Sequence, residues 1–300
     1  MKAAQAGVRI SLRNILYLTD FSEPSEAALS FAVTMARRHG AKVHALHVLL
    51  PTPYPYAAPG LAAATLEAEE ESAQAEMQRV ESQLAGLQHE TIVERGTCVW
   101  PGVEQAIQEG SIDLIVAGTR GRTGVDKLMM GSVAEEIFRR SPVPVLTIGP
   151  SVQRNVHNGA RFHRVLFATD FTPESLAGAP YAISLAQENQ SRLLLLVVMR
   201  KPEHPSAADN RRVELSATEA LQRLYELVPE SAKLEFPAEV AVEFGEPAER
   251  IVEIAKQRGV DLIVLGVRET PQIGAATHLE RAIAHKVVAH AACPVLTVRG

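Results

Sequence analysis

Cysteine is scarce in this chain of 300 residues, which contains only two, Cys98 and Cys293. Two cysteines so far apart give neither a disulfide framework nor the spacing of a zinc site, so we expect a reducing, cytoplasmic location. Long hydrophobic runs are also missing. The most apolar stretch, residues 193–199, is far too short to cross a membrane, and the first residues lack the apolar core of a signal peptide.

An excess of basic charge is absent as well. The formal net charge is −5, which argues against a nucleic-acid-binding protein. Hydrophobic residues make up 46% of the chain and charged residues 22%, as in ordinary globular proteins. The length predicts about two domains.

The chain repeats itself along its length. Three blocks recur in the same order, which indicates duplication of a whole domain. We therefore expect domains at 1–150 and 164–300 with a linker at 151–163. The matched blocks are NILYLTDFSEPS (14–25) with RVLFATDFTPES (164–175), SIDLIVAG (111–118) with GVDLIVLG (259–266), and PVPVLTI (142–148) with ACPVLTV (292–298).

Within each half, apolar strand-like runs alternate with segments of helical spacing. This alternation predicts an α/β fold with a mostly parallel sheet and helices on both faces. Ser22 or Ser25 can cap a helix that stops at Gly40. In such open sheets, ligands bind beyond the carboxyl ends of the strands. In the first half we expect strands at 14–19, 42–50, 90–96, 112–118 and 143–149, and helices at 101–110, 132–140 and around Met77, Val80, Leu84 and Leu87.

The stretch GTRGRTGVDKLMMGS, residues 118–132, follows an expected strand and precedes an expected helix. Its four glycines leave backbone N–H groups accessible, and the helix start near Ser132 favours anions, so a polyphosphate fits. The alternative is ordinary turn punctuation, with Ser132 and Glu135 forming a capping box. The stretch matches neither the Walker pattern nor GxGxxG. The stretch carries three cationic side chains, Arg120, Arg122 and Lys127, and one anionic side chain, Asp126.

The spacing Gly118-x-x-Gly121, nine residues, then Gly131-Ser132 resembles the G-2x-G-9x-G-[S/T] signature of ATP-binding universal stress proteins. The resemblance extends over both halves, since each opens with a strand ending in Asp and closes with a PVL strand. The block GAKVHALHV (40–48) is also similar to the family. The resemblance implies two tandem three-layer α/β/α domains, each an open, Rossmann-like five-stranded sheet of the adenine nucleotide α-hydrolase type.

Carried over by position, the resemblance implies an adenine-nucleotide site in the first half. Asp20 would lie at the ribose with Thr19 beside it, although an Asp after a strand can also merely cap the next helix. Val48 would meet adenine through its backbone. The phosphates would be held by Gly118, Gly121, Gly131 and Ser132, by the N–H of Val133, and by a loop that carries Arg120 and Arg122.

We therefore expect an ATP-binding stress-response protein that acts as a nucleotide-dependent binding or regulatory module. The ligand is ATP or a related adenine nucleotide, with Mg²⁺ on its phosphates and no metal ligands from the protein. No catalytic residue is assigned, because the sequence after the first strand, TDFSEPS, lacks the HxGH or SGGxDS motifs of related enzymes. A weak ATPase and a nucleotide-free, partner-binding scaffold are the alternatives.

The second half departs from the signature. Gly266 persists, but Glu269 replaces the second glycine, and Arg281-Ala282 stand where Gly131-Ser132 do. A carboxylate at the phosphate position repels phosphate, so we expect no ATP there in the manner of the first half. We also expect the closing strands, 143–148 and 293–298, to need covering, by pairing between the two domains or in a homodimer.

Other conspicuous residues have simpler interpretations. His44 and His47 lie three apart, on opposite faces of a strand, which argues against a metal pair. Trp100 is expected to pack at a helix start or to shield a nucleotide. Cys98 and Cys293 are expected to be buried filler, and the acidic run 67–72 is expected to be a solvated helix face.

Overall fold

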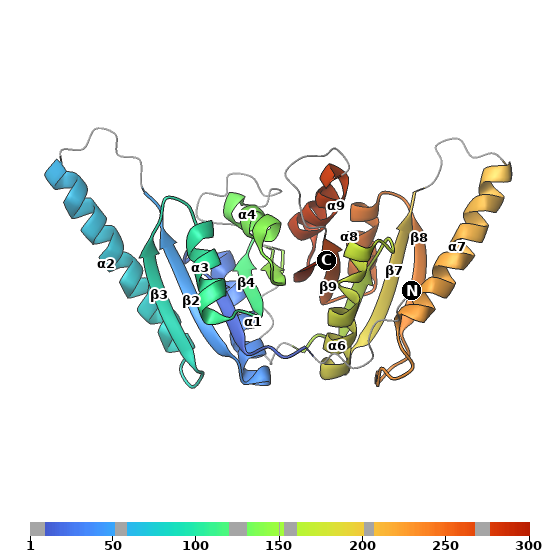
Figure 1. Cartoon of the computed structure of the whole chain (residues 1–300), viewed down its shortest axis with the longest axis horizontal. Coiled ribbons are helices and arrows are strands. Elements are labelled where there is room, and N and C mark those ends of the chain that lie inside the picture. Colours follow the sequence, from blue (N-terminus) through green and yellow to red (C-terminus); the bar gives the residue numbers. More distant parts are fainter. Residues whose placement is uncertain are drawn as a thin grey trace. The chain divides into compact units, whose positions relative to one another are not determined.

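The computed structural model of the chain describes residues 10–51, 59–119, 131–149, 151–152, 161–200, 207–267 and 277–300. The chain divides into two compact units (Figure 1). We call residues 11–148 the N-terminal unit, and residues 149–300 together with Ile10 the C-terminal unit. In the described ranges, no helix combines the length and apolarity needed to span a membrane.

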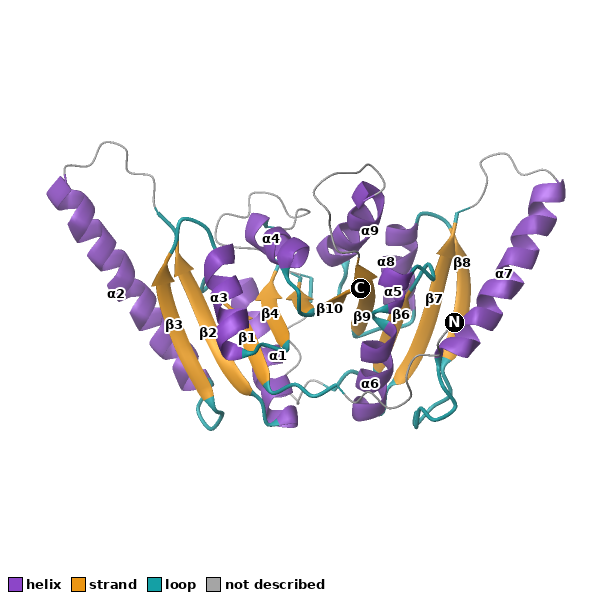
Figure 2. Ribbon diagram, in the orientation of Figure 1, coloured by secondary structure: helices purple, strands orange, loops and turns teal. Residues whose placement is uncertain are grey.

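The N-terminal unit is a five-stranded sheet in the order β3-β2-β1-β4-β5, and every pair of neighbours is parallel (Figure 2). Strand and helix alternate along the chain, which confirms the predicted α/β class. The elements are β1 (Asn14–Leu18), α1 (Glu23–His39), β2 (Lys42–Leu49), α2 (Pro59–Gln83), β3 (His89–Arg95), α3 (Trp100–Gly110), β4 (Leu114–Gly118), α4 (Ser132–Arg140) and β5 (Val145–Ile148).

The C-terminal unit repeats this topology, with parallel neighbours in the order β10-β9-β6-β7-β8. The first helix of the repeat is broken into two pieces. The elements are β6 (Arg164–Ala168), α5 (Pro173–Leu176), α6 (Ala179–Asn189), β7 (Arg192–Met199), α7 (Ala207–Leu227), β8 (Glu239–Phe244), α8 (Pro247–Gln257), β9 (Leu262–Val267), α9 (Thr277–His290) and β10 (Val295–Arg299).

Local sequence explains where the first helix begins and ends. Ser22 occupies the N-cap position of α1 without a side-chain capping bond, and a proline in the first turn supplies the φ that a helix start needs. Gly40 ends the helix in the left-handed region, with φ 65°, and its N–H bonds the carbonyl of Ala36. The predicted stop at Gly40 is confirmed.

An Asp that recurs in the repeated blocks IDLIVAG and VDLIVLG fixes the strand starts. One carboxylate oxygen of Asp113 accepts the backbone N–H groups of Arg13 (2.7 Å) and Asn14 (2.9 Å), just where β1 begins. Asp261 accepts the N–H groups of His163 (2.7 Å) and Arg164 (3.0 Å) ahead of β6, one on each carboxylate oxygen. Burial raises the pKa of Asp261 despite these bonds. The repeated acid is therefore structural and lies away from the carboxyl ends of the strands.

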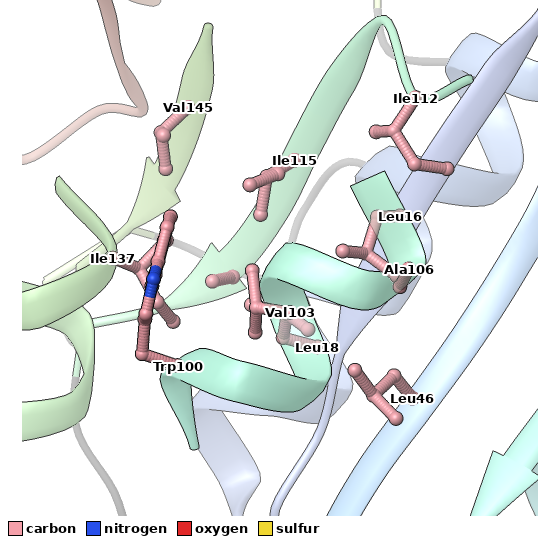
Figure 3. Close-up of a cluster of buried hydrophobic side chains, with 11 residues drawn as sticks. Leu16, Leu18, Leu46, Trp100, Val103, Ala106, Ile112, Ile115, Ile137 and Val145 are labelled. Carbon is pink, nitrogen blue, oxygen red and sulfur yellow. The ribbon is translucent and has the colours of Figure 1, made fainter. Parts of the chain in front are cut away.

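Apolar side chains from the sheet, α3 and α4 form a core cluster of the N-terminal unit (Figure 3). Trp100 is 3% exposed and lies in this core at the first residue of α3, which confirms the packing interpretation. The guanidinium carbon of Arg140, in the last turn of α4, lies 4.9 Å from the centre of its ring. Trp100 therefore touches the helix that follows the glycine-rich stretch.

Candidate functional site

The chain makes a tight turn immediately after β1. The N–H of Thr19 still bonds β2, at the carbonyl of Leu46 (3.0 Å). The hydroxyl oxygen of Thr19 then accepts the N–H of Phe21 (3.0 Å), whose φ of 59° is in the left-handed region. The turn carries the chain away from the sheet and leaves the end of β1 beside the longer β2.

Asp20 occupies the middle of this turn and is partly exposed. One of its carboxylate oxygens accepts both the N–H (3.1 Å) and the hydroxyl (2.5 Å) of Ser22. Because Ser22 itself is the N-cap residue of α1, these bonds close a turn ahead of the helix and do not cap its first-turn N–H groups. Through these bonds Asp20 fixes the turn that leads into α1.

Three further side chains, none of which the sequence singled out as part of a site, brace the turn. A ring nitrogen of His47 lies 2.8 Å from the carbonyl of Thr19, and its ring centre lies 4.3 Å from that of Phe21. The hydroxyl of Tyr17 donates to the carbonyl of Ser25 (2.8 Å), and burial raises the pKa of Tyr17 to about 12. The turn that presents Asp20 is thus held from the sheet and from α1.

The end of β2 presents Val48 to the same place. Residues two apart on a strand direct their backbone groups to the same side. Leu46 bonds toward β1, so the N–H and carbonyl of Val48 also point that way, beyond the point where β1 has turned off. Leu49, which points the other way, bonds the N–H of Gly96 (3.1 Å). Val48 therefore turns its backbone toward the side of Asp20.

Gly118, at the end of β4, has a packing requirement of its own. A Cβ at this position would lie 2.9 Å from the carbonyl carbon of Pro24 and 3.0 Å from the N of Ser25, both backbone atoms at the start of α1. In the C-terminal unit, a Cβ on Gly266 would lie 2.2 Å from the carbonyl oxygen of Glu174 and 2.4 Å from that of Ser175. The first glycine of the signature therefore lets the first helix approach the sheet.

The start of α4 lies next to the end of β4. The helix begins at Ser132, as predicted, but its N-cap is Gly131, so the Ser132–Glu135 capping box is wrong. The N–H of Gly131 donates to the carbonyl of Thr119 (2.8 Å) and is therefore already used. First-turn N–H groups have no intrahelical partner, so those of Ser132 and Val133 remain as donors. Predicted residues Arg120, Gly121 and Arg122 lie outside the described residues.

Thr119 follows β4 directly and is 1% exposed. Its N–H donates to the carbonyl of Ile148 (2.9 Å), and its carbonyl accepts the N–H of Gly131. The backbone of Thr119 therefore joins β4, β5 and the start of α4. Its hydroxyl is buried and has no hydrogen-bond partner among the described residues. Thr119 is therefore a candidate site residue that was not predicted from the sequence. Its distinguishing feature, a buried hydroxyl without a partner among the described residues, is visible only in the structure.

The C-terminal unit repeats the turn nearly bond for bond. The N–H of Thr169 donates to the carbonyl of Leu196 (2.9 Å), and Phe171 has a φ of 63°. One oxygen of Asp170 accepts the N–H (3.0 Å) and hydroxyl (2.6 Å) of Thr172. Burial raises the pKa of Asp170, but the hydrogen bonds to its carboxylate outweigh that effect and hold the pKa below its ordinary value.

The other end of the C-terminal unit differs. Here the carbonyl of Val267, which follows Gly266 as Thr119 follows Gly118, accepts the N–H of Gly300 (3.1 Å). Helix α9 begins at Thr277, whereas the residue aligned with Ser132 is Ala282. Position 282 therefore lies inside a helix, where its N–H is used within the helix.

The remaining predictions have mixed outcomes. His44 lies near Asn14 (3.4 Å) and Glu90 (3.5 Å), so its surroundings are separate from those of His47. Among the described residues, no group of three His, Cys, Asp or Glu side chains could hold a metal ion.

Cys293 is buried, and desolvation raises its pKa to about 12. The expectation that Cys98 is buried is wrong, because it lies exposed in the turn between β3 and α3.

The chain has two α/β units, each with a sheet of parallel strands and an Asp-bearing turn at the end of its first strand. These features define a tandem Rossmann-like protein. The chain belongs to the universal stress protein family, whose sequence model matches residues 11–149 and 161–299. This membership supports a role in the stress response.

Individual relatives match one half at a time or the whole fold. Universal stress protein YxiE of Bacillus subtilis is 33% identical over 152 residues, which are 46% of this chain and 99% of the relative. Universal stress protein MJ0531 of Methanocaldococcus jannaschii is 30% identical over 139 residues, 45% of this chain and 81% of the relative. The crystal structure of a universal stress protein from Archaeoglobus fulgidus shares the fold, with a TM-score of 0.63, 22% identity, and coverage of 95% of this chain and 98% of that chain.

Proposed function

We propose that the N-terminal unit binds ATP and that the protein acts in the stress response as a nucleotide-dependent regulatory module. The observation that carries the proposal is the convergence of three groups at the carboxyl ends of neighbouring strands. These are the Asp20 turn after β1, the backbone of Val48 at the end of β2, and the start of α4 next to β4. Open parallel sheets bind ligands at this edge.

The nucleoside end of the site would be formed by Asp20 and Val48. A carboxylate accepts hydrogen bonds from vicinal ribose hydroxyls, and those bonds are charge-assisted. The N–H and carbonyl of Val48 offer one donor and one acceptor side by side, which matches the donor–acceptor edge of adenine. Thr19 supports this end by fixing the turn, not by reaching the ligand, because its hydroxyl is already bonded to Phe21.

The phosphate end would be formed by the start of α4. The N–H groups of Ser132 and Val133, together with the helix dipole, favour an anion at this point. Gly131 has no side chain to stand in the way, and its bond to Thr119 fixes the helix start. The buried hydroxyl of Thr119 lies at the same corner and fits a phosphate oxygen or the loop around it.

Mg²⁺ is assigned to the phosphates, where it would neutralise part of their charge. The described residues include no cluster of acidic side chains that would hold it independently. The protein's contribution is then binding and positioning, with at most weak hydrolysis. A nucleotide-dependent change at α4 would reach Arg140 and the ring of Trp100, which pack together.

The experiment is to identify nucleotide carried through purification by mass spectrometry and then to titrate the stripped protein with MgATP. Gly121→Glu places a carboxylate where the signature puts phosphate. Losing charge-assisted bonds worth about 1.5–3 kcal/mol each weakens binding at least tenfold. Gln108→Glu adds the same charge on the exposed face of α3 and leaves affinity unchanged. Equal affinity in folded Gly121→Glu and wild type would rule out this site.

A further inference from the structure

The two ends of the nucleotide site separate in the C-terminal unit: the nucleoside end is kept and the phosphate end is not. The kept end consists of Asp170 in its turn and the end of β7. The carbonyl of Leu196 points toward β6, where it accepts the N–H of Thr169. The carbonyl of Met199 points toward β8, where it accepts the N–H of Gly245 (3.0 Å). By strand alternation, the backbone of Val198 faces the side on which β6 has ended, as Val48 does in the other unit.

Asp170 has the chemistry to receive sugar hydroxyls. Its side chain is exposed, and the bonds from Thr172 go to one carboxylate oxygen, Oδ1. Those bonds hold the pKa below its ordinary value, so the group is ionised at neutral pH. An ionised carboxylate beside a strand-end N–H and carbonyl fits a flat heterocycle that carries a diol.

The phosphate end differs from that of the N-terminal unit in two ways. Helix α9 starts five residues before the position aligned with Ser132, so the aligned N–H groups are bonded inside the helix. The N–H of Gly300 donates to the carbonyl of Val267. Gly300 also packs tightly, since a Cβ at this position would lie 2.7 Å from the Cα of Glu174. The residue at the matching sequence position after β5 is Pro150, which has no N–H to donate.

We propose that the C-terminal unit binds a nucleoside that carries no phosphate, through Asp170 and the backbone of Val198. The inference rests on the proposed function, because it gives the Asp turn the ribose-binding role argued for Asp20. The chain then has one site for the nucleotide and one for its dephosphorylated form, and the two ligands are distinguished at the helix start that follows the fourth strand of each unit.

The test uses the full chain and adenosine as the probe. Calorimetry with MgATP alone comes first and reports the N-terminal site. Adenosine is then titrated into chain saturated with MgATP, so that only a site closed to ATP responds. We expect one adenosine per chain, binding at least roughly tenfold weaker in Asp170→Asn because a charged acceptor is lost, and unchanged in Asp20→Asn.

Hydrogen–deuterium exchange gives a second reading that needs no variant. Adenosine added to the ATP-saturated chain should slow exchange at residues 169–172 and 197–199. The inference is overturned if the ATP-saturated chain binds no adenosine, if binding survives Asp170→Asn unchanged, or if MgATP alone fills two sites. Failure of ATP to bind would overturn the proposed function instead, and adenosine binding that depends on Asp170 would still support the inference.

Discussion

Gly118→Ala separates the packing role of the first signature glycine from its expected role in binding phosphate. The added Cβ would lie 2.9–3.0 Å from backbone atoms of Pro24 and Ser25, well inside van der Waals contact. Backbone atoms cannot rotate aside as a side chain does, so the start of α1 must move. Overpacking of this kind costs about 1–3 kcal/mol, and the Asp20 turn that leads into α1 moves with the helix.

Trp100 makes the assay specific to one unit. It is the single tryptophan of the chain, and its ring is buried in the N-terminal unit, so thermal unfolding followed by its fluorescence reports that unit. A loss of 1–3 kcal/mol lowers the midpoint by roughly 3–10 °C for a domain of this size. ATP affinity should fall as well, because the ribose end shifts.

Gly102→Ala is the matched control. Its Cβ meets the Glu94 carboxylate at 1.6 Å, the movable end of a side chain, and alanine in a helix gains up to about 1 kcal/mol over glycine. We expect its midpoint to stay within a few degrees of wild type. A Gly118→Ala protein as stable as wild type would refute the packing argument.

Three other outcomes follow from the structure. Cys98 should react with a thiol reagent in the native protein and Cys293 only after unfolding, so Cys98→Ser should abolish native labelling; reaction of both thiols in the native state would contradict their burial. Tyr17→Phe should cost about 0.5–1.5 kcal/mol in denaturant unfolding, since it removes one buried hydrogen bond to the carbonyl of Ser25, which lies within α1; an unchanged midpoint would show that this bond does not stabilise the fold. Each half expressed alone should dimerise through β5 or β10, which end their sheets; halves that sediment only as monomers at high concentration would refute the pairing.

Elements and repeats were predictable from the sequence because their signals are local. Hydrophobic periodicity and the glycine stops gave the strands, the end of α1 at Gly40 and the start of α4 at Ser132. Duplication gave the tandem arrangement, since two copies of one pattern imply two copies of one fold. The Asp20 turn was also visible, as a strand followed directly by Asp.

The rest depends on contacts between residues distant in sequence. His47 reaches Thr19 across 28 positions, and the need for Gly118 comes from a helix that begins almost a hundred residues earlier. The start of α9 at Thr277 was not predicted, although Thr277 and Glu280 have the spacing of a capping box. The exposure of Cys98 was missed because composition says only that cysteine is usually buried.

The most direct test of the account is calorimetric titration of the intact, nucleotide-stripped chain with MgATP. We expect one ATP per chain, bound in the N-terminal unit, with affinity lowered at least roughly tenfold by Gly121→Glu. No binding, or two equivalent sites that Gly121→Glu reduces to one, would contradict it.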